Sequence, residues 1–161
     1  YLMNVKVKPA ANVPEGKPLA NYEFDPLCYD YLDRMADLCA AHGVQFVLMK
    51  APSLYPYWYD QWEEQMEDYA QTRGIPYINF LELTDTMGID FDTDTYDSGL
   101  HLNLYGAEKL SHWFGAWLQE NCDVPDRRGE EPYQSVWTEK SAAYAARKER
   151  LEAERDAAAE S

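Results

Sequence analysis

The sequence contains no long apolar segment. None of its 161 residues belongs to a run that approaches the roughly 18 apolar residues needed to cross a bilayer as a helix. No basic start followed by a short apolar stretch and a small-residue cleavage site marks a signal peptide. We therefore expect no membrane segment in this chain. The first residue is Tyr1 rather than methionine, and we expect that residues preceding it were removed.

Basic residues are also scarce. The chain carries 14 Lys and Arg against 29 Asp and Glu, which gives a formal charge of −15 at pH 7. A chain this acidic repels phosphate backbones, and no basic stripe offsets the repulsion. We expect no nucleic-acid partner.

Cysteines are few and do not form closely spaced pairs. The odd count of 3 argues against a disulfide scaffold. Cys28 and Cys39 lie about three helical turns apart, so we expect both to sit as small apolar groups on one buried helix face.

Metal-binding patterns are missing as well. The acidic run "DFDTDTYD" over residues 90–97 invites a calcium hypothesis, but an EF-hand loop needs glycine at its sixth position and glutamate at its twelfth. Counted from Asp90, those positions hold Thr95 and His101. We interpret the run as a solvated acidic loop, and no metal or organic cofactor is predicted.

What the chain does contain is a globular composition, with 46% hydrophobic and 14% aromatic residues. Its length allows one domain with a short appendage. Residues 1–26 carry four of the prolines and are predicted to be an extended arm or loop. The periodicity then predicts helices over 27–41, 57–72 and 104–120, strands over 44–50 and 77–80, and a linker and charged helix within 123–161. Helix and strand alternating in this way predict an α/β domain with parallel strands.

One short segment, "TYDSGLHLNLYGAEKL", suggests chemistry. Asp97 stands four residues before His101, and a helix is predicted to start directly afterwards, with Asn103 as its cap. An aspartate that accepts from one imidazole nitrogen leaves the other free to take a proton from a hydroxyl group. The alternative is that Asp97 is a turn residue and His101 packs near the helix start. The spacing alone leaves both open.

The wider segment "YDSGLHLNLYGAEKLSHWFGAWL", preceded by "HGVQFVLMKAPS" and "GIPYINF", resembles the C-terminal half of SGNH/GDSL-type hydrolases, in their bacterial, cell-surface-like branch. The resemblance covers roughly residues 27–135. It implies a flavodoxin-like three-layer sandwich with a parallel sheet, incomplete at its N-terminal side, to which residues 27–122 contribute the C-terminal part. It also implies an extracytoplasmic or cell-surface location.

The function implied by the resemblance is that of a serine hydrolase or acyl-ester transferase acting on small esters or acylated glycans. His101 would be the general base and then the general acid, and Asp97 would orient it. The family's aspartate and histidine are usually separated by two residues, whereas three separate Asp97 and His101 here. The Gly-Asp-Ser block that carries the family's nucleophile, and the blocks that donate to the oxyanion, are absent.

The nucleophile would therefore stand upstream of Tyr1, and this chain alone is expected to be inactive or weak. Ser53, just past the predicted strand 44–50, is either a local nucleophile or a loop serine lining the pocket. Lys50, Trp58 and Asp94 are further candidates for the pocket lining.

The competing hypothesis is a non-catalytic binding or structural module derived from such a domain. An upstream strand followed by Gly-x-Ser would favour the enzyme, and a start codon just before Tyr1 would favour the module. In either case a sheet of two or three strands leaves an open edge, so we expect a homo-oligomer or an arm that covers it.

Overall fold

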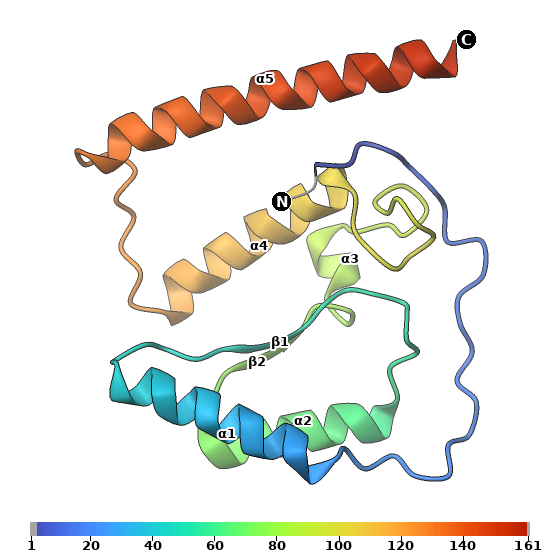
Figure 1. The fold of residues 1–161 in the computed structure, drawn as a ribbon, viewed down its shortest axis with the longest axis vertical. Coiled ribbons are helices and arrows are strands. Elements are labelled where there is room, and N and C mark those ends of the chain that lie inside the picture. Colours follow the sequence, from blue (N-terminus) through green and yellow to red (C-terminus); the bar gives the residue numbers. More distant parts are fainter. Residues whose placement is uncertain (1–2, 161) are drawn as a thin grey trace. The chain divides into compact units, whose positions relative to one another are not determined.

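The structure is a computed structural model that describes residues 3–160 and divides into two compact units (Figure 1). Unit 1 comprises Tyr1–Ala11 and Asp85–Ser161, and unit 2 comprises Asn12–Thr84. The elements, in chain order, are α1 Pro26–Ala41, β1 Leu48–Lys50, α2 Asp60–Arg73, β2 Tyr77–Asn79, α3 Thr84–Met87, α4 Leu104–Asn121 and α5 Tyr133–Ala159. Residues 3–25 contain neither helix nor strand, and this arm is shared between the units.

Unit 2 contains the only sheet within residues 3–160. Its two strands are parallel, with Leu48 opposite Tyr77 and Lys50 opposite Asn79. Parallel strands need a crossover connection, which α2 supplies here. The prediction that these two segments pair in parallel is confirmed.

Local signals set the ends of the unit 2 helices. The Asp25 carboxylate accepts a hydrogen bond from the Leu27 amide at 2.9 Å, and Pro26 occupies the first helical position of α1, where its missing N–H costs nothing. Gly74 ends α2 in a left-handed conformation with φ 64°, which a residue without Cβ adopts at little cost. α1 and α2 are tied together by Tyr69, whose hydroxyl donates to Asp33 at 2.8 Å.

The predicted three-layer sandwich is wrong. About half of the chain is helical, and the two strands have 3 residues each. The strands are shorter than the apolar runs that predicted them. Only residues 48–50 and 77–79 pair with a neighbouring strand, and the rest of each run has no strand beside it. A two-stranded sheet of this width cannot separate two helix layers. The chain is therefore mostly helical.

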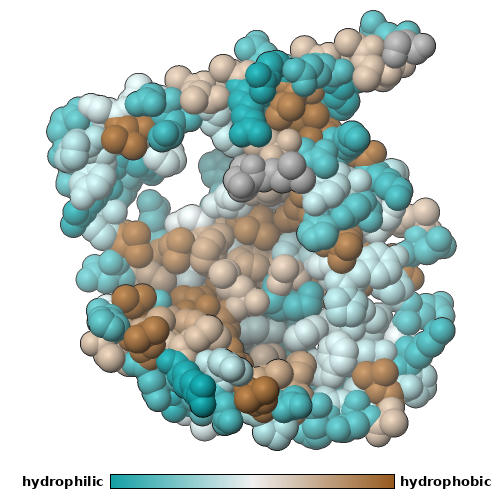
Figure 2. All heavy atoms as spheres, viewed as in Figure 1, coloured by the Kyte–Doolittle hydropathy of each residue, from teal (hydrophilic) through white to brown (hydrophobic). Residues whose placement is uncertain are grey.

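The predicted buried face of α1 is also exposed. Leu27 and Tyr31 are each 55% exposed, and Leu38 is 61% exposed. Cys28, expected on a buried face, is exposed too. These residues follow a helical period, so the pattern identified the helix correctly, but no described residues of unit 2 cover its apolar side. Figure 2 shows hydrophobic residues at the surface over α1.

Unit 1 is built around α4 and the long helix α5. Its buried cluster consists of Met3, Val5 and Leu104, with Tyr144 and Leu151 packed against it. Polar contacts reinforce this packing: the Tyr144 hydroxyl and the Lys148 ammonium both donate to the Glu108 carboxylate, at 2.9 and 2.7 Å. α5 has 27 residues, most of them charged or small and exposed, and its Tyr144 and Leu151 side chains pack against the buried cluster.

Across residues 3–160, no helix is both long enough and apolar enough to cross a lipid bilayer.

Candidate active site

The candidate site lies in the loop that precedes α4. Thr95 and Leu102 form an antiparallel bridge, so residues 95–102 fold back on themselves as a short hairpin. The reversal uses two consecutive residues with positive φ, Ser98 at 67° and Gly99 at 93°. A positive φ is unfavourable for a residue with a Cβ, which makes Ser98 the strained member of the turn.

The N-terminal arm runs beside this hairpin. The Lys8 amide donates to the Thr95 carbonyl at 2.8 Å, and the Ser98 amide donates to the Lys8 carbonyl at 3.2 Å. The Thr95 hydroxyl also donates to the Lys8 carbonyl, at 3.0 Å. The arm, which is far away in the sequence, thus supplies hydrogen-bond partners for backbone groups of the loop that would otherwise bond to water.

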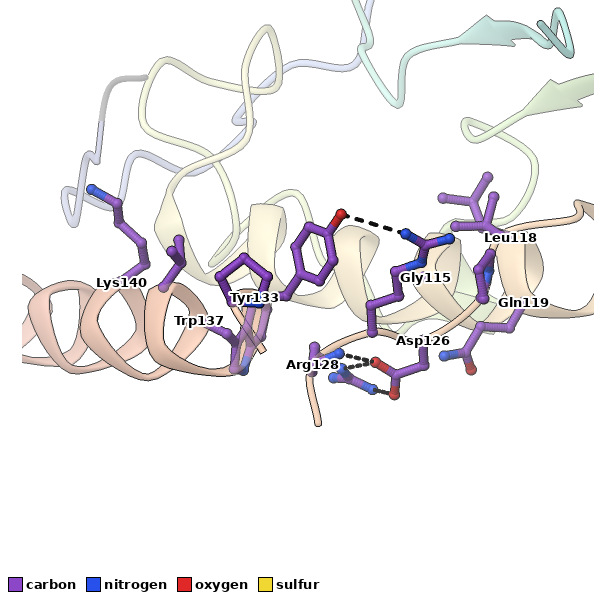
Figure 3. Close-up of a pocket in the computed structure, with 13 residues that line it drawn as sticks. Gly115, Leu118, Gln119, Asp126, Arg128, Tyr133, Trp137 and Lys140 are labelled. Carbon is purple, nitrogen blue, oxygen red and sulfur yellow. Dashed lines mark hydrogen bonds and ion pairs between the residues drawn. The ribbon is translucent and has the colours of Figure 1, made fainter. Parts of the chain in front are cut away.

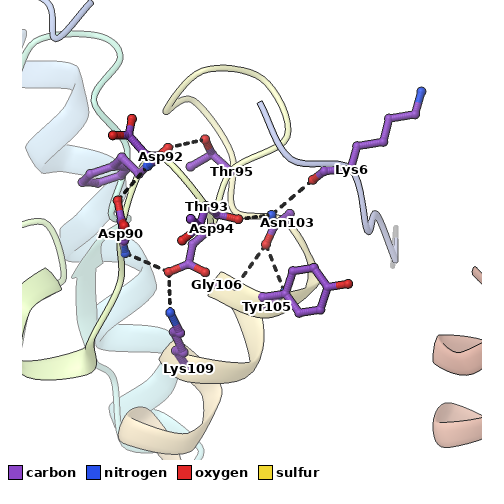
Figure 4. Close-up of polar contacts among 11 residues, drawn as sticks. Lys6, Asp90, Asp92, Thr93, Asp94, Thr95, Asn103, Tyr105, Gly106 and Lys109 are labelled. Atoms are coloured by element: carbon purple, nitrogen blue, oxygen red, sulfur yellow. Dashed lines mark hydrogen bonds and ion pairs between the residues drawn. The ribbon is translucent and has the colours of Figure 1, made fainter. Parts of the chain in front are cut away.

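Asn103 joins the arm, the loop and α4 (Figure 4). Its side-chain oxygen accepts from the amides of Tyr105 and Gly106, at 3.0 and 3.1 Å, which confirms the predicted helix cap. Its side-chain nitrogen donates to the carbonyls of Lys6 and Thr93, at 3.1 and 2.8 Å. Asn103 is only 1% exposed, so all four hydrogen bonds form away from water.

Asp94 is held in the same network, and not against His101. Its carboxylate is 3% exposed and accepts from the Lys109 ammonium and the Asp90 amide, both at 2.7 Å. The Asp90 carboxylate in turn accepts from the Asp92 amide at 2.9 Å. These acidic side chains organise loop amides, and among residues 3–160 no group of three or more His, Cys, Asp or Glu side chains is placed to hold a metal ion.

Asp97 and His101 are in contact, as the orienting role that the resemblance implies for Asp97 requires. Asp97 Oδ2 lies 2.6 Å from His101 Nδ1, and Asp97 Oδ1 accepts from the His101 amide at 2.7 Å. An ionised carboxylate can only accept, so Nδ1 carries the proton in this pair. In the neutral ring Nε2 is then the acceptor, and within the described residues it has no hydrogen-bond partner. Its surroundings are open, since the His101 side chain is 59% exposed.

Tyr96 adds a contact that sequence reasoning missed. Its ring is stacked on the His101 imidazole, with centroids 5.7 Å apart and planes 7° from parallel. The carboxylate and the phenol ring therefore fix the imidazole from two directions. The spacing of five residues gave no signal for this, because the contact depends on the hairpin turn at Ser98 and Gly99.

The pKa of Asp97 reflects two opposing effects. Partial burial raises the pKa of its carboxyl, while hydrogen bonds from the His101 ring and amide lower it. The net result is a pKa below the ordinary value, so the carboxylate stays ionised at neutral pH and can stabilise an imidazolium.

The other predicted pocket residues belong to unit 2. The Lys50 ammonium donates to the Ala51 carbonyl at 2.7 Å and lies 5.3 Å from the centre of the Trp58 ring. Burial lowers the pKa of Lys50, and the nearby Glu63 carboxylate partly offsets this. The Ser53 hydroxyl donates to the Tyr55 carbonyl at 2.7 Å. Whether any of them shares a cleft with His101 stays a prediction.

Sequence reasoning also missed Glu63, which organises the end of the unit 2 sheet. One of its carboxylate oxygens accepts from the Trp58 indole at 2.6 Å, the Tyr77 hydroxyl at 2.9 Å and the Asn79 amide at 2.8 Å. These three donors share one carboxylate oxygen, so the observed role of Glu63 is to connect α2 to β2 and to the loop that precedes α2.

Comparison with known proteins gives no match: no protein-family model, curated protein or solved structure is similar to this chain.

Proposed function

We propose that this chain carries the histidine and aspartate of a serine-type acyl-ester hydrolase or acyl-ester transferase acting on small esters or acylated glycans, as its resemblance to SGNH/GDSL-type hydrolases implies. The observation that carries the proposal is the Asp97–His101 pair, with a 2.6 Å contact at Nδ1 of an imidazole whose side chain is 59% exposed. A carboxylate that orients an imidazole and leaves its second nitrogen accessible is the arrangement that general-base activation of a hydroxyl requires.

The proposed chemistry follows from the two ring nitrogens. As a serine oxygen attacks the ester carbonyl, His101 Nε2 takes the hydroxyl proton and the imidazolium forms next to the ionised Asp97. The same proton then passes to the departing alkoxide, leaving an acyl-serine. Water or an acceptor hydroxyl, deprotonated in its turn by Nε2, releases the acyl group.

The nucleophile of this mechanism has no candidate beside His101 within residues 3–160. Within residues 3–160, no serine hydroxyl is hydrogen-bonded to the imidazole. Ser53 donates its hydroxyl proton to the Tyr55 carbonyl, which supports a structural role for that serine over a nucleophilic one. We therefore expect the 161-residue chain to hydrolyse esters poorly.

The test uses p-nitrophenyl acetate with the complete reading frame that contains this chain. We expect His101→Ala to lower kcat/KM by about 10²–10⁴-fold. Asp97→Asn should lower it as well, because the amide can favour the wrong tautomer. His112→Ala is the matched control, since it removes another histidine, on α4, and should leave turnover unchanged.

A fluorophosphonate probe would identify the nucleophile by mass spectrometry. Equal activity in the His101→Ala and His112→Ala variants would end the catalytic proposal. Strong turnover of the 161-residue chain alone, lost in both His101→Ala and Ser53→Ala, would instead make Ser53 the nucleophile.

The second candidate function is a non-catalytic binding or structural module, favoured by the exposed apolar side of α1. Leu27, Tyr31, Met35 and Leu38 lie along one face of this helix and are 44–61% exposed. Single exposed apolar residues are ordinary, whereas a contiguous row marks an interaction surface. If the protein encoded by the full reading frame had no esterase activity, and if association with a partner or a second copy required this face of α1, the binding or structural module would be favoured.

A further inference from the structure

A groove in unit 1 has a lining that includes neither Asp97 nor His101, and Figure 3 shows the residues that form it. Its walls are the C-terminal half of α4, the 124–128 segment and the first turns of α5, and it encloses about 740 Å³. We call it the α4–α5 groove. Sites for small organic ligands usually occupy about 300–1,000 Å³, so this volume suits a single small molecule.

The floor of the α4–α5 groove is apolar and open to solvent. Val124, Val136 and Trp137 line it and are 54%, 53% and 52% exposed. Leu118 from α4 and Tyr133 from α5 continue the same surface. Within a chain of such acidic composition, this much exposed apolar surface in one concave place indicates a ligand with a substantial apolar part.

Cations surround this floor. Arg127, Arg128 and Lys140 all line the groove, against a single acidic residue, Asp126. Arg128 is neutralised, since its guanidinium binds the Asp126 carboxylate in a bidentate pair at 2.8 and 2.6 Å. Arg127 lies over the Tyr133 ring at 5.6 Å, and neither it nor Lys140 forms an ion pair with any carboxylate of residues 3–160.

The charge of the groove is therefore opposite to that of the chain. Formal charge over the whole sequence is −15, yet two unpaired cations stand beside an apolar floor. Local positive charge of this kind raises affinity for an anion only where the anion can approach the cations directly, since the remainder of the chain repels it. A compact ligand with one anionic head satisfies this condition, whereas an anionic membrane surface would meet the acidic remainder of the chain.

We propose that the α4–α5 groove binds a free carboxylate amphiphile of the fatty-acid type. The carboxylate binds at Arg127, Lys140 at the other end of the groove adds to the local positive charge, and the alkyl chain lies on Val124, Val136 and Trp137. Guanidinium groups suit a carboxylate because they offer several donors in a fixed planar geometry. The site is independent of ester hydrolysis and does not rest on the function proposed above.

The test is isothermal titration calorimetry of the full chain with sodium decanoate, below its micelle concentration and at low ionic strength. We expect saturable binding of one decanoate per chain. The double variant Arg127→Gln with Lys140→Gln should bind about tenfold more weakly, because each exposed ion contact contributes modestly. Val136→Glu, which places a carboxylate on the apolar floor at an exposed helical position, should abolish binding.

Two controls make the result specific. The double variant Lys17→Gln with Arg34→Gln removes the same amount of charge from exposed positions in unit 2 and should bind decanoate like the unmodified chain. Decanol, which has the alkyl chain without the charge, should bind at least about tenfold more weakly than decanoate. Absence of saturable binding by the unmodified chain, an equal loss in both double variants, or equal affinity for decanol would each overturn the proposal.

Discussion

Replacing Asn103 by alanine should destabilise unit 1 more than any ordinary surface substitution. The change removes two bonds that cap α4, to the amides of Tyr105 and Gly106, and two that hold the carbonyls of Lys6 and Thr93. The site is 1% exposed, so water cannot replace these partners without opening the structure.

The magnitude follows from the two kinds of contact. Loss of a side-chain helix cap costs about 1 kcal/mol. A buried carbonyl left without its donor costs about 1–3 kcal/mol, and Asn103→Ala leaves two. We therefore expect a loss of about 3–7 kcal/mol. This is a large part of the roughly 5–15 kcal/mol that ordinarily separates a folded domain from its unfolded chain. Asn103→Ser keeps a capping oxygen and should recover about 1 kcal/mol of the loss.

Urea unfolding, followed by circular dichroism and by hydrogen exchange at the first amides of α4, measures these differences. Asn21→Ala is the matched control, because Asn21 is exposed and, within residues 3–160, its side chain accepts a hydrogen bond from the Glu23 amide alone. The cost of this substitution should stay within about 0.5 kcal/mol. A cost below about 1 kcal/mol for Asn103→Ala, or an Asn103→Ser variant no more stable than Asn103→Ala, would refute the assignment of Asn103 as the buried junction.

Three further predictions concern α4, the site loop and α1. Gly106→Ala should destabilise unit 1 despite the better helix propensity of alanine, because the new Cβ would lie 2.6 Å from the Asp94 carbonyl oxygen. At Gly115 a new Cβ meets nothing within 4 Å, so Gly115→Ala should stabilise α4 by up to about 1 kcal/mol. Thermal unfolding of the two variants tests this contrast. The pKa of the Asp97 carboxyl in the folded chain lies below its ordinary 3.8, so the ionised carboxylate stabilises the fold above pH 3.8 and this stabilisation is lost as the pH falls through the folded pKa. The difference in unfolding free energy between the unmodified chain and Asp97→Asn should therefore shrink below about pH 4. Leu38→Lys should reduce any self-association detected by light scattering, since it places a charge on the exposed apolar face of α1, and an unchanged oligomeric state would exclude that face from the contact.

The features that were predictable from sequence depend on residues close together in the chain. Asp25 and Asn103 cap their helices through amides two or three residues ahead, and Asp97 reaches His101 over four residues. In each case the backbone geometry of a turn or helix start brings the groups together, so the spacing marks the contact as a candidate before the structure is known. The parallel strand pair was predictable for a related reason, since a helix between two neighbouring strands is the usual crossover connection of a parallel pair.

Features that depend on distant partners were not predictable in this way. The periodicity of α1 showed where the helix lies, but not whether other residues would cover its apolar side, and Leu38 is 61% exposed. The predicted lengths of the two strands were wrong for the same reason, because a β-strand extends only as far as a neighbouring strand pairs with it. The sandwich fold required more paired strands than β1 and β2 supply, and no local pattern reports that shortage.

The N-terminal arm shows how far the candidate site depends on such distant contacts. The Asn103 side chain donates to the Lys6 carbonyl across 97 residues, and the Thr95 hydroxyl reaches the Lys8 carbonyl across 87. These bonds lie immediately before and after the Asp97–His101 turn, so the arm holds both ends of the hairpin that presents the imidazole. The short-range contact brings the carboxylate and the imidazole together, and the long-range hydrogen bonds hold the hairpin that carries them. A site of this kind is recognisable from a few neighbouring residues, while its geometry is set by residues at the other end of the chain.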